Sequence, residues 1–364
     1  MEQVQGLKEY VKLEQYRKAL GLPEEVTETY EMLAQGEYNR NYIFTHPVTK
    51  KKLILRVNFG SQMHLENQIA YEYQVLRMLE NSGRTPKAFY VDGSLEHLEQ
   101  GVMVMEYLPG HALDYRTELM HAVGCLADIH SVKIPKEHSL IVPANPLRAI
   151  LEECEEMFRV YEESPLGQEW QKKKIRKMLD MVWRLVDCLE EPVYRCCINT
   201  ELNSTNFLIN GGTYDNFLID WEKPLYGDPA QDLGHFLAPT TTFWKTDVIL
   251  SREEADAFIE KYISEVKGRF DTAGLKKRTD VYIPVTCLRG ITWCAMAWIE
   301  YKNPDKVIFN ESTFQKLEAY LSRELNCSRS RSPSSRMVNR SRFSILSLIS
   351  RSRQNQSGLA LTSL

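Results

Sequence analysis

The sequence has no long apolar run: no stretch approaches the ~18 apolar residues that a membrane-spanning helix needs. Its opening residues, MEQVQGLKEYVKLEQY, lack the apolar segment of a secretory signal peptide. Eight cysteines are present, but none shows Cys-x-x-Cys spacing or clusters with histidines. We therefore expect a cytoplasmic protein with reduced thiols, no membrane association and no thiolate-bound metal.

Negative charge is missing from one region only. The last 39 residues, 326–364, contain seven Arg and no Asp, Glu or Lys, so residues 1–325 carry 38 Lys+Arg against 49 Asp+Glu. An acidic body disfavours nucleic-acid binding and suits a cationic substrate or a bound metal. The Ser/Arg-rich end is expected to be disordered, because it cannot bury enough apolar area. A frameshifted or read-through end explains its composition as well as a functional basic tail does.

The order of sequence patterns predicts two lobes. Residues 1–27 form a polar helical extension, and residues 28–108 read strand, strand, helix, strand, strand, with the helix ending at Gly83. Strongly periodic helices dominate residues 109–325. The sequence therefore predicts an α+β protein with a small β-rich lobe, a larger helical lobe and the tail 326–364.

One hairpin in the helical half carries polar residues with a possible chemical role. The apolar runs NFLING and YDNFLIDW flank the pair Gly211–Gly212, which is a hairpin signal. This places Asn206 before the first strand and Asp220 after the second, so both side chains can meet at one end. Mg²⁺ takes such oxygen ligands, and Glu201 on the preceding loop can accept a hydrogen bond from a hydroxyl. A polar loop that merely caps a hairpin is the alternative interpretation.

The segments INTELNSTNFLI, FLIDWE and GDPAQDL resemble the aminoglycoside phosphotransferase and choline kinase-like family. The pattern of that family runs His-Gly-Asp, four residues, Asn, then Ile-Asp-Trp/Phe-Glu, then Gly-Asp-Pro and a further Asp. The segment LADIHSV is also similar to a family segment, with His130 as a structural residue. The resemblance covers residues 28–325 and implies a bilobal, protein-kinase-like fold. It further implies ATP- and Mg²⁺-dependent transfer of the γ-phosphate to a hydroxyl of a small molecule.

The resemblance assigns roles in the helical lobe residue by residue. It implies that Asn206 and Asp220 bind Mg²⁺ and that Glu201 occupies the catalytic carboxylate position. Asp228 and Asp232 are implied to brace the loop. The stretch DPAQDLGHF independently predicts that Asp228 caps a helix.

In the small lobe the resemblance places Arg56 on the strand that grips nucleotide phosphates. Glu72, on the following helix, is its natural carboxylate partner, since the Arg fork binds carboxylate or phosphate oxygens in two-point fashion. Backbone amides near Gly36 can touch phosphates, and backbone groups from Glu106 to Leu108 can face an adenine ring. The alternative is that the arginine is an exposed strand residue and the glutamate lies on a solvated helix face.

The acceptor is less readable than the rest of the site. Trp221 and Glu222 follow the expected metal ligand directly, and Trp293 and Trp298 lie on a late helix. Aromatic faces beside carboxylates suit a cationic amino-alcohol, amino sugar or aminoglycoside. Helical spacing nevertheless favours core packing for the late aromatics. The absence of His-Arg-Asp, Asp-Phe-Gly and Ala-Pro-Glu segments argues against a protein kinase.

The sequence departs from the family pattern where the chemistry is expected. Asn199 and Glu201 stand where the family has His and Asp. Asn can still hold a loop by hydrogen bonds, but Glu moves the carboxylate by roughly one bond, ~1.5 Å. A misplacement of about 1 Å can cost ~100-fold in rate. A catalytically silent, nucleotide-binding module is therefore the alternative function, and neither the acceptor nor the oligomeric state is predicted.

Overall fold

The structure is a computed structural model of the whole chain. It describes residues 4–26, 28–187, 189–212, 215–303 and 310–322. The tail 326–364, predicted to be disordered, lies outside the described residues.

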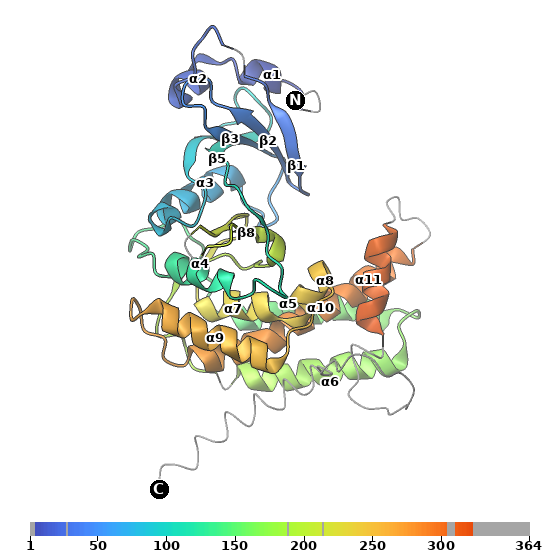
Figure 1. Cartoon of the computed structure of the whole chain (residues 1–364). Helices are drawn as coiled ribbons and strands as arrows, with labels where there is room; N and C mark the ends of the chain where they lie inside the picture. Colours follow the sequence, from blue (N-terminus) through green and yellow to red (C-terminus); the bar gives the residue numbers. More distant parts are fainter. Residues whose placement is uncertain (1–3, 27, 188, 213–214, 304–309, 323–364) are drawn as a thin grey trace.

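The small lobe is built on one antiparallel sheet with the strand order β1-β2-β3-β5-β4. The helix α3 interrupts the sheet in the chain and packs below it (Figure 1). The predicted order of strand and helix patterns is confirmed except at its start, where three strands precede the helix because the turn at Gly36 divides the first predicted run into β1 and β2. The elements are α1 (Leu7–Tyr10), α2 (Glu14–Leu20), β1 (Glu31–Gln35), β2 (Asn39–Thr45), β3 (Lys52–Asn58), α3 (Gln68–Leu79), β4 (Ala88–Asp92) and β5 (Gly101–Glu106).

Alternation along β5 explains why this sheet is covered on both faces. Val102 and Val104 belong to an outer core with the N-terminal helices, whereas Met103 and Met105 belong to the main core with α3. Successive side chains of a strand point to opposite faces, so the apolar run GVMVM is buried on both sides. The sheet is consequently fixed between α1 and α2 above and α3 below, which sets the position of β3.

The helical lobe contains most of the chain. Its long helices pack side by side below the small lobe (Figure 1). These helices are α4 (His121–His130), α5 (Pro146–Glu163), α6 (Glu169–Val186), α7 (Pro229–Leu237), α8 (Pro239–Thr246), α9 (Arg252–Val266), α10 (Leu275–Tyr301) and α11 (Glu311–Leu321). Within the described part of the chain, no helix combines the length and the apolar composition that crossing a membrane requires.

Two small sheets lie between the lobes. The first has the order β6-β8-β9, formed by His111–Ala112, Phe207–Ile209 and Phe217–Leu218, and it contains the predicted hairpin. The second pairs β7 (Cys196–Ile198) with β10 (Leu225–Gly227). The expectation of a single strand pair in the helical half is therefore wrong. The strand pair β7–β10 was missed because three-residue strands with distant partners leave no periodic signal.

Helix α7 begins as predicted and packs unusually closely on α10. Asp228 is its N-cap, and its side chain accepts from the Ala230 amide at 2.9 Å. Gly234 faces Tyr282 of α10 so closely that an added Cβ would overlap the Tyr282 Cβ and lie 3.0 Å from its carbonyl carbon. The absence of a side chain at Gly234 thus sets the separation of the two helices, and with it the position of Asp232.

We predict that Gly234→Ala destabilises the protein by ~1–3 kcal/mol, because the new methyl group overpacks the α7–α10 contact. The sign of the change in unfolding free energy tests the contact, since the same substitution at an uncrowded helix position raises stability by up to about 1 kcal/mol. Urea unfolding would measure the difference. A midpoint equal to or above that of the wild type would contradict the close contact.

Candidate functional site

Pairing of β7 with β10 brings two distant segments together. Ile198 is opposite Leu225 in this ladder, so the loop that follows β7 runs beside the residues that precede β10. Thr200 Oγ1 donates to the Lys223 carbonyl at 2.8 Å, and Asn199 Nδ2 donates to the Asp220 carbonyl at 2.8 Å. The predicted catalytic loop and the segment after the hairpin therefore form one hydrogen-bonded unit.

Asp232 holds this loop from below. Its two carboxylate oxygens accept from the backbone amides of Asn199 at 2.8 Å and Thr200 at 2.7 Å. One oxygen also contacts His130 Nε2 at 3.2 Å, and His130 Nδ1 lies 2.7 Å from the Tyr262 hydroxyl. Asp232 and His130 are both fully buried, so water does not compete for these hydrogen bonds. This is the geometry expected for a residue that braces the loop.

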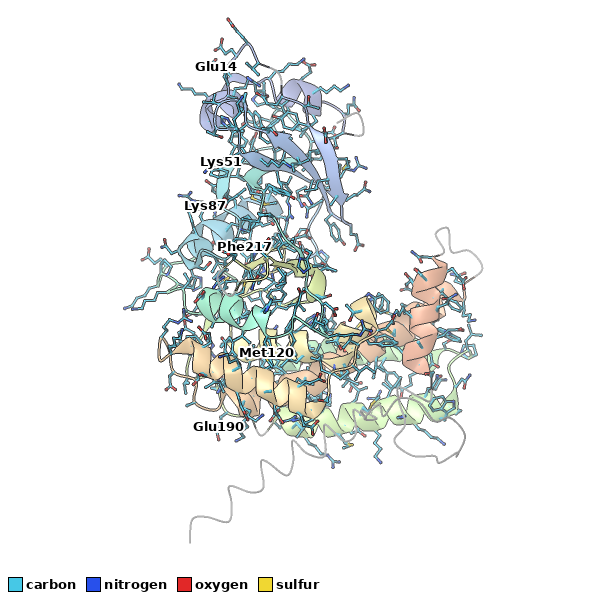
Figure 2. The ribbon with its side chains drawn as sticks, in the orientation of Figure 1. Glu14, Lys51, Lys87, Met120, Glu190 and Phe217 are labelled. Atoms are coloured by element: carbon cyan, nitrogen blue, oxygen red, sulfur yellow. The ribbon has the colours of Figure 1, made fainter. Side chains whose placement is uncertain are left out.

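The hairpin places Asn206 and Asp220 at the same end, as its sequence predicts. The Ile219 amide donates to the Asn206 carbonyl at 2.9 Å, which sets the two residues side by side. Asn206 is buried and its Nδ2 donates to the Glu201 carbonyl at 3.3 Å, whereas Asp220 is exposed. The amide oxygen and the carboxylate can thus face one bound ion. Figure 2 labels Phe217 of the same hairpin at mid-height, between Lys87 above and Met120 below.

Two non-glycine residues of the site have left-handed backbone conformations. Thr200 has φ 72° and Asp220 has φ 69°. Such conformations cost about 1–3 kcal/mol each and persist only where the surroundings impose them. At Thr200 the surroundings are the bonds from its amide to Asp232 and from its hydroxyl to Lys223. No sequence pattern indicates this strain, because threonine is an unusual residue for the conformation.

The predicted pairing of Arg56 with Glu72 is confirmed. Arg56 Nη1 forms a short ion pair with Glu72 Oε1, and its Nε donates to Asn41 Oδ1 at 3.0 Å. Both charged residues are buried, so the alternative of solvated surface positions is excluded. Burial works against charge on Arg56, but Glu72 and then Asp220 hold its pKa above the ordinary value. Arg56 of the small lobe and Asp220 of the hairpin therefore interact electrostatically.

Glu222 faces the small lobe. Its Oε1 accepts a short hydrogen bond from Asn39 Nδ2 and lies 3.8 Å from Arg56 Nη1. Burial, and then the neighbouring charge of Asp220, raise the pKa of Glu222 to about 7. Of the two roles expected for Glu222, contact with the substrate or support of the metal ligands, its position favours the second, because its carboxylate joins the small-lobe cluster.

Two further predicted residues are internal. Trp221 is 1% exposed and its Nε1 donates to the Leu218 carbonyl at 3.1 Å. A direct contact between this ring and a substrate is therefore excluded, and what remains is support of the hairpin from inside. Asp228 is also buried, and besides capping α7 it pairs with Arg278 Nε at 2.6 Å.

The remaining small-lobe positions flank the same region. Gly36 follows β1, and its amide donates to the Asn39 carbonyl at 2.8 Å, which closes the turn to β2. At the other edge of the sheet, the Glu106 amide donates to the Lys87 carbonyl at 2.8 Å. Leu108 is half-buried on the connection between β5 and β6. A base lying there could use only the carbonyl of Glu106, because its amide is already bonded.

A cavity of about 570 Å³ opens beside Glu201. Lys223 Nζ lies 2.6 Å from Glu201 Oε1. On the same wall Arg289 makes a two-point contact with Glu153, at 2.8 and 3.1 Å. Each of these two carboxylates thus has its own cation, which gives no support to the expectation of a cationic acceptor. Sequence reasoning missed Lys223 and Arg289, since neither lies in a recognisable pattern.

Aromatic residues form another part of the cavity wall. Trp293 is 40% exposed and meets Trp244 edge to face, with ring centroids 5.4 Å apart. Trp298, on the same helix, instead packs against Tyr161 at 6.1 Å. Core packing, the expectation for both late tryptophans, therefore fits Trp298 but is wrong for Trp293.

The chain matches a known protein family. The model of a family described as "Phosphotransferase enzyme family" matches residues 29–275. No curated protein sequence matches the chain.

Several solved structures share the fold. A spectinomycin phosphotransferase, in complex with ADP and spectinomycin, superposes with a TM-score of 0.57 at 13% identity, covering 96% of this chain and 98% of the other. Choline kinase from Cryptosporidium parvum gives 0.58 at 14%, covering 83% and 92%. Ethanolamine kinase from Plasmodium vivax gives 0.56 at 15%, covering 86% and 85%. At these identities the likeness establishes the bilobal α+β fold.

We predict that Asp232→Asn lowers the free energy of unfolding by ~2 kcal/mol, because an amide group cannot accept from the Asn199 and Thr200 amides as a carboxylate does. Chemical denaturation would measure it. The matched control is Asp187→Asn, whose carboxylate is 61% exposed and 3.5 Å from Arg148. The control should change stability by less than about 0.5 kcal/mol. Equal effects of the two substitutions would contradict the bracing role of Asp232.

A second prediction concerns pH. Burial, then Arg289 and Lys223, lower the pKa of His235 to about 4, whereas an unfolded imidazole titrates near 6.5. The unfolded chain therefore binds the extra proton first, and stability is lost as the pH falls from about 6.5 toward 4. Between pH 6.5 and 5 the wild type should lose ~1.5 kcal/mol more than His235→Gln does. Identical slopes of unfolding free energy against pH would refute this.

Proposed function

The chain belongs to the phosphotransferase enzyme family, and on that premise we propose that it is an ATP- and Mg²⁺-dependent kinase of a small molecule. The acceptor group is a hydroxyl. The structural neighbours named above are a spectinomycin phosphotransferase, a choline kinase and an ethanolamine kinase. Their names support a small molecule as the acceptor.

The observation that carries the proposal is the convergence of three segments on one point. The hairpin presents Asn206 and Asp220, and the preceding loop presents Glu201. From the other lobe, the Arg56–Glu72 pair lies close enough for Asp220 to raise the pKa of Arg56. Phosphoryl transfer needs held phosphates, a held metal and an aimed hydroxyl. These three groups are suited to those three tasks.

The residues present fit Mg²⁺. Asp220, Glu222 and Glu72 bring three carboxylates to one region against the single Arg56, and Glu72 Oε2 is buried without a partner among the described residues. No cluster of three His, Cys, Asp or Glu in metal-binding arrangement occurs in the described chain. Mg²⁺ does not need one, because it takes one or two carboxylates plus substrate phosphates and water. Asn206 and Asp220 would hold the ion, which would neutralise charge on the phosphates.

The nucleotide then lies between the lobes. Arg56, kept charged by Glu72, supplies the fork that grips phosphate oxygens. The Gly36 amide already donates to the Asn39 carbonyl, so the other backbone amides of that turn contact the phosphates, and the Glu106 carbonyl and the Leu108 backbone contact the adenine. Gln68 Nε2 donates to the Glu222 carbonyl at 2.7 Å, so α3 keeps the small lobe joined to the hairpin segment.

Glu201 acts on the acceptor. Its carboxylate accepts a hydrogen bond from the acceptor hydroxyl and takes the proton as that oxygen bonds to the γ-phosphorus and the bond to the β-phosphate oxygen breaks. The acceptor occupies the cavity beside Glu201, with Trp293 as one wall. Because Glu153 and Glu201 have their own cations, the acceptor does not need a positive charge to bind there.

We predict that Asp220→Ala lowers Mg²⁺-dependent ATP turnover by at least ~100-fold, because charge stabilisation by the metal is worth several kcal/mol. The assay is ATP consumption with residues 1–325 and with the full chain, across amino-alcohols, sugars, amino sugars and aminoglycosides. Titration calorimetry of ATP with and without Mg²⁺ gives a second readout, in which the variant should lose the benefit of the metal.

The matched control is Asp215→Ala, at the other end of the same hairpin. It should leave both turnover and ATP affinity unchanged. Full activity of Asp220→Ala would refute the metal assignment. Tight ATP binding by the wild type without transfer to any acceptor would instead favour the silent nucleotide-binding module.

A further inference from the structure

We propose that Lys223 is a positioning residue, which fixes the carboxylate of Glu201 and so adapts the site to a glutamate where the family has aspartate. The inference rests on the proposed function, since it concerns the group that faces the acceptor. Lys223 does not touch the reacting atoms in this proposal. It acts only through the side chain that does.

The contact is direct and well supported. Lys223 Nζ lies 2.6 Å from Glu201 Oε1, with the side chains 14% and 39% exposed. The Lys223 carbonyl accepts from Thr200 Oγ1 at 2.8 Å, so the backbone of the lysine is tied to the residue just before Glu201. The strand pair β7–β10 sets this register. The lysine is therefore held at both its main chain and its side chain.

A glutamate needs such a partner more than an aspartate does. Its additional methylene adds one rotatable bond, which lengthens the reach of the carboxylate and multiplies its positions. An ammonium bound to one oxygen selects one of these positions. Lys223 contacts Oε1 of Glu201, and among the described residues Oε2 of Glu201 has no hydrogen-bond partner, so this second oxygen remains open to a hydroxyl. Lys223 thus holds the Glu201 carboxylate in one position, although the longer side chain could adopt several.

Neither Arg289 nor His235, which also line the cavity, can hold the Glu201 carboxylate in place of Lys223. Arg289 already binds both oxygens of Glu153, at 2.8 and 3.1 Å. His235 is kept neutral, since burial and the two cations lower its pKa to about 4. Lys223 is consequently the charged partner of Glu201 on this wall.

The test is a double-mutant cycle of Glu201→Asp, Lys223→Met and the double variant, assayed with an acceptor that the wild type phosphorylates. Lys223→Met should lower kcat ~10- to 100-fold, the effect of a misplacement near 1 Å, with the KM for ATP unchanged. Glu201→Asp should also lower kcat, although it introduces the residue of the family pattern, because the shorter side chain no longer reaches Lys223. The double variant should be no slower than Glu201→Asp alone.

Two comparisons separate positioning from a general structural role. Lys223→Arg, which keeps the charge, should recover a large part of the lost kcat. Lys12→Met removes another lysine paired with a carboxylate, 3.1 Å from Glu9, in the connection between α1 and α2, and should leave kcat unchanged. In urea unfolding, the shift in midpoint caused by Lys223→Met should be smaller in the Glu201→Asp background, which reports the contact without any assay of activity.

Several outcomes would overturn the inference. Lys223→Met with unchanged kcat would show that the contact is incidental, and a faster variant would show that the lysine restrains Glu201 instead of placing it. Losses that multiply in the double variant would show that the two residues act independently. A wild type that phosphorylates no acceptor would overturn the proposed function and this inference together. An active wild type with an indifferent Lys223→Met overturns this inference alone.

Discussion

The two hydrogen bonds from the Asn199 and Thr200 amides to the buried carboxylate of Asp232 are the constraint on which the site depends. A carboxylate with no exposure must be paired, and backbone amides are strong partners for it. These two hydrogen bonds fix the backbone of the loop at Asn199 and Thr200, and they thereby set the position of the next residue, Glu201. Helix α7 supplies Asp232, and its position depends on the close approach to α10 at Gly234. Packing deep in the helical lobe thus determines where a carboxylate stands at its surface.

The second constraint joins the lobes through one helix. Three side chains of α3 point toward the site: Gln68 bonds the Glu222 carbonyl, Tyr71 bonds the Pro224 carbonyl at 2.6 Å, and Glu72 pairs with Arg56. Two of these bonds hold the segment between Asp220 and β10, and the third holds Arg56 of the small lobe. The small lobe is therefore tied to the helical lobe by the same residues that arrange its charge. Burial, and then the negative charge of Asp220, raise the pKa of Glu222, and a divalent cation bound beside them would offset that charge.

The departures from the family pattern are linked in space. Asn199 uses its amide nitrogen to bind the Asp220 carbonyl and its amide oxygen to accept from the Glu201 amide at 3.2 Å. Thr200 takes the conformation that glycine adopts most easily, and its hydroxyl offsets part of that cost by binding Lys223. Lys223 in turn contacts Glu201. Asn199, Thr200, Glu201 and Lys223 therefore form a single connected set, which explains how the loop keeps a defined shape although Asn199 and Glu201 depart from the family pattern.

The sequence by itself determined the local features, because each depends on neighbours in the chain. Alternation and periodicity predicted the sheet and the helices, the Gly-Gly pair predicted the hairpin that joins Asn206 to Asp220, and Asp-Pro predicted the start of α7. The resemblance to the family placed Arg56 on its strand, with Glu72 of the following helix as its partner. Only the tertiary structure decided which way the other side chains point. Trp221 is internal, Glu222 faces the small lobe, and Lys223 reaches Glu201, although the three are consecutive. Their directions follow from the β7–β10 ladder and from α3, which join residues far apart in sequence, so no local pattern could reveal them.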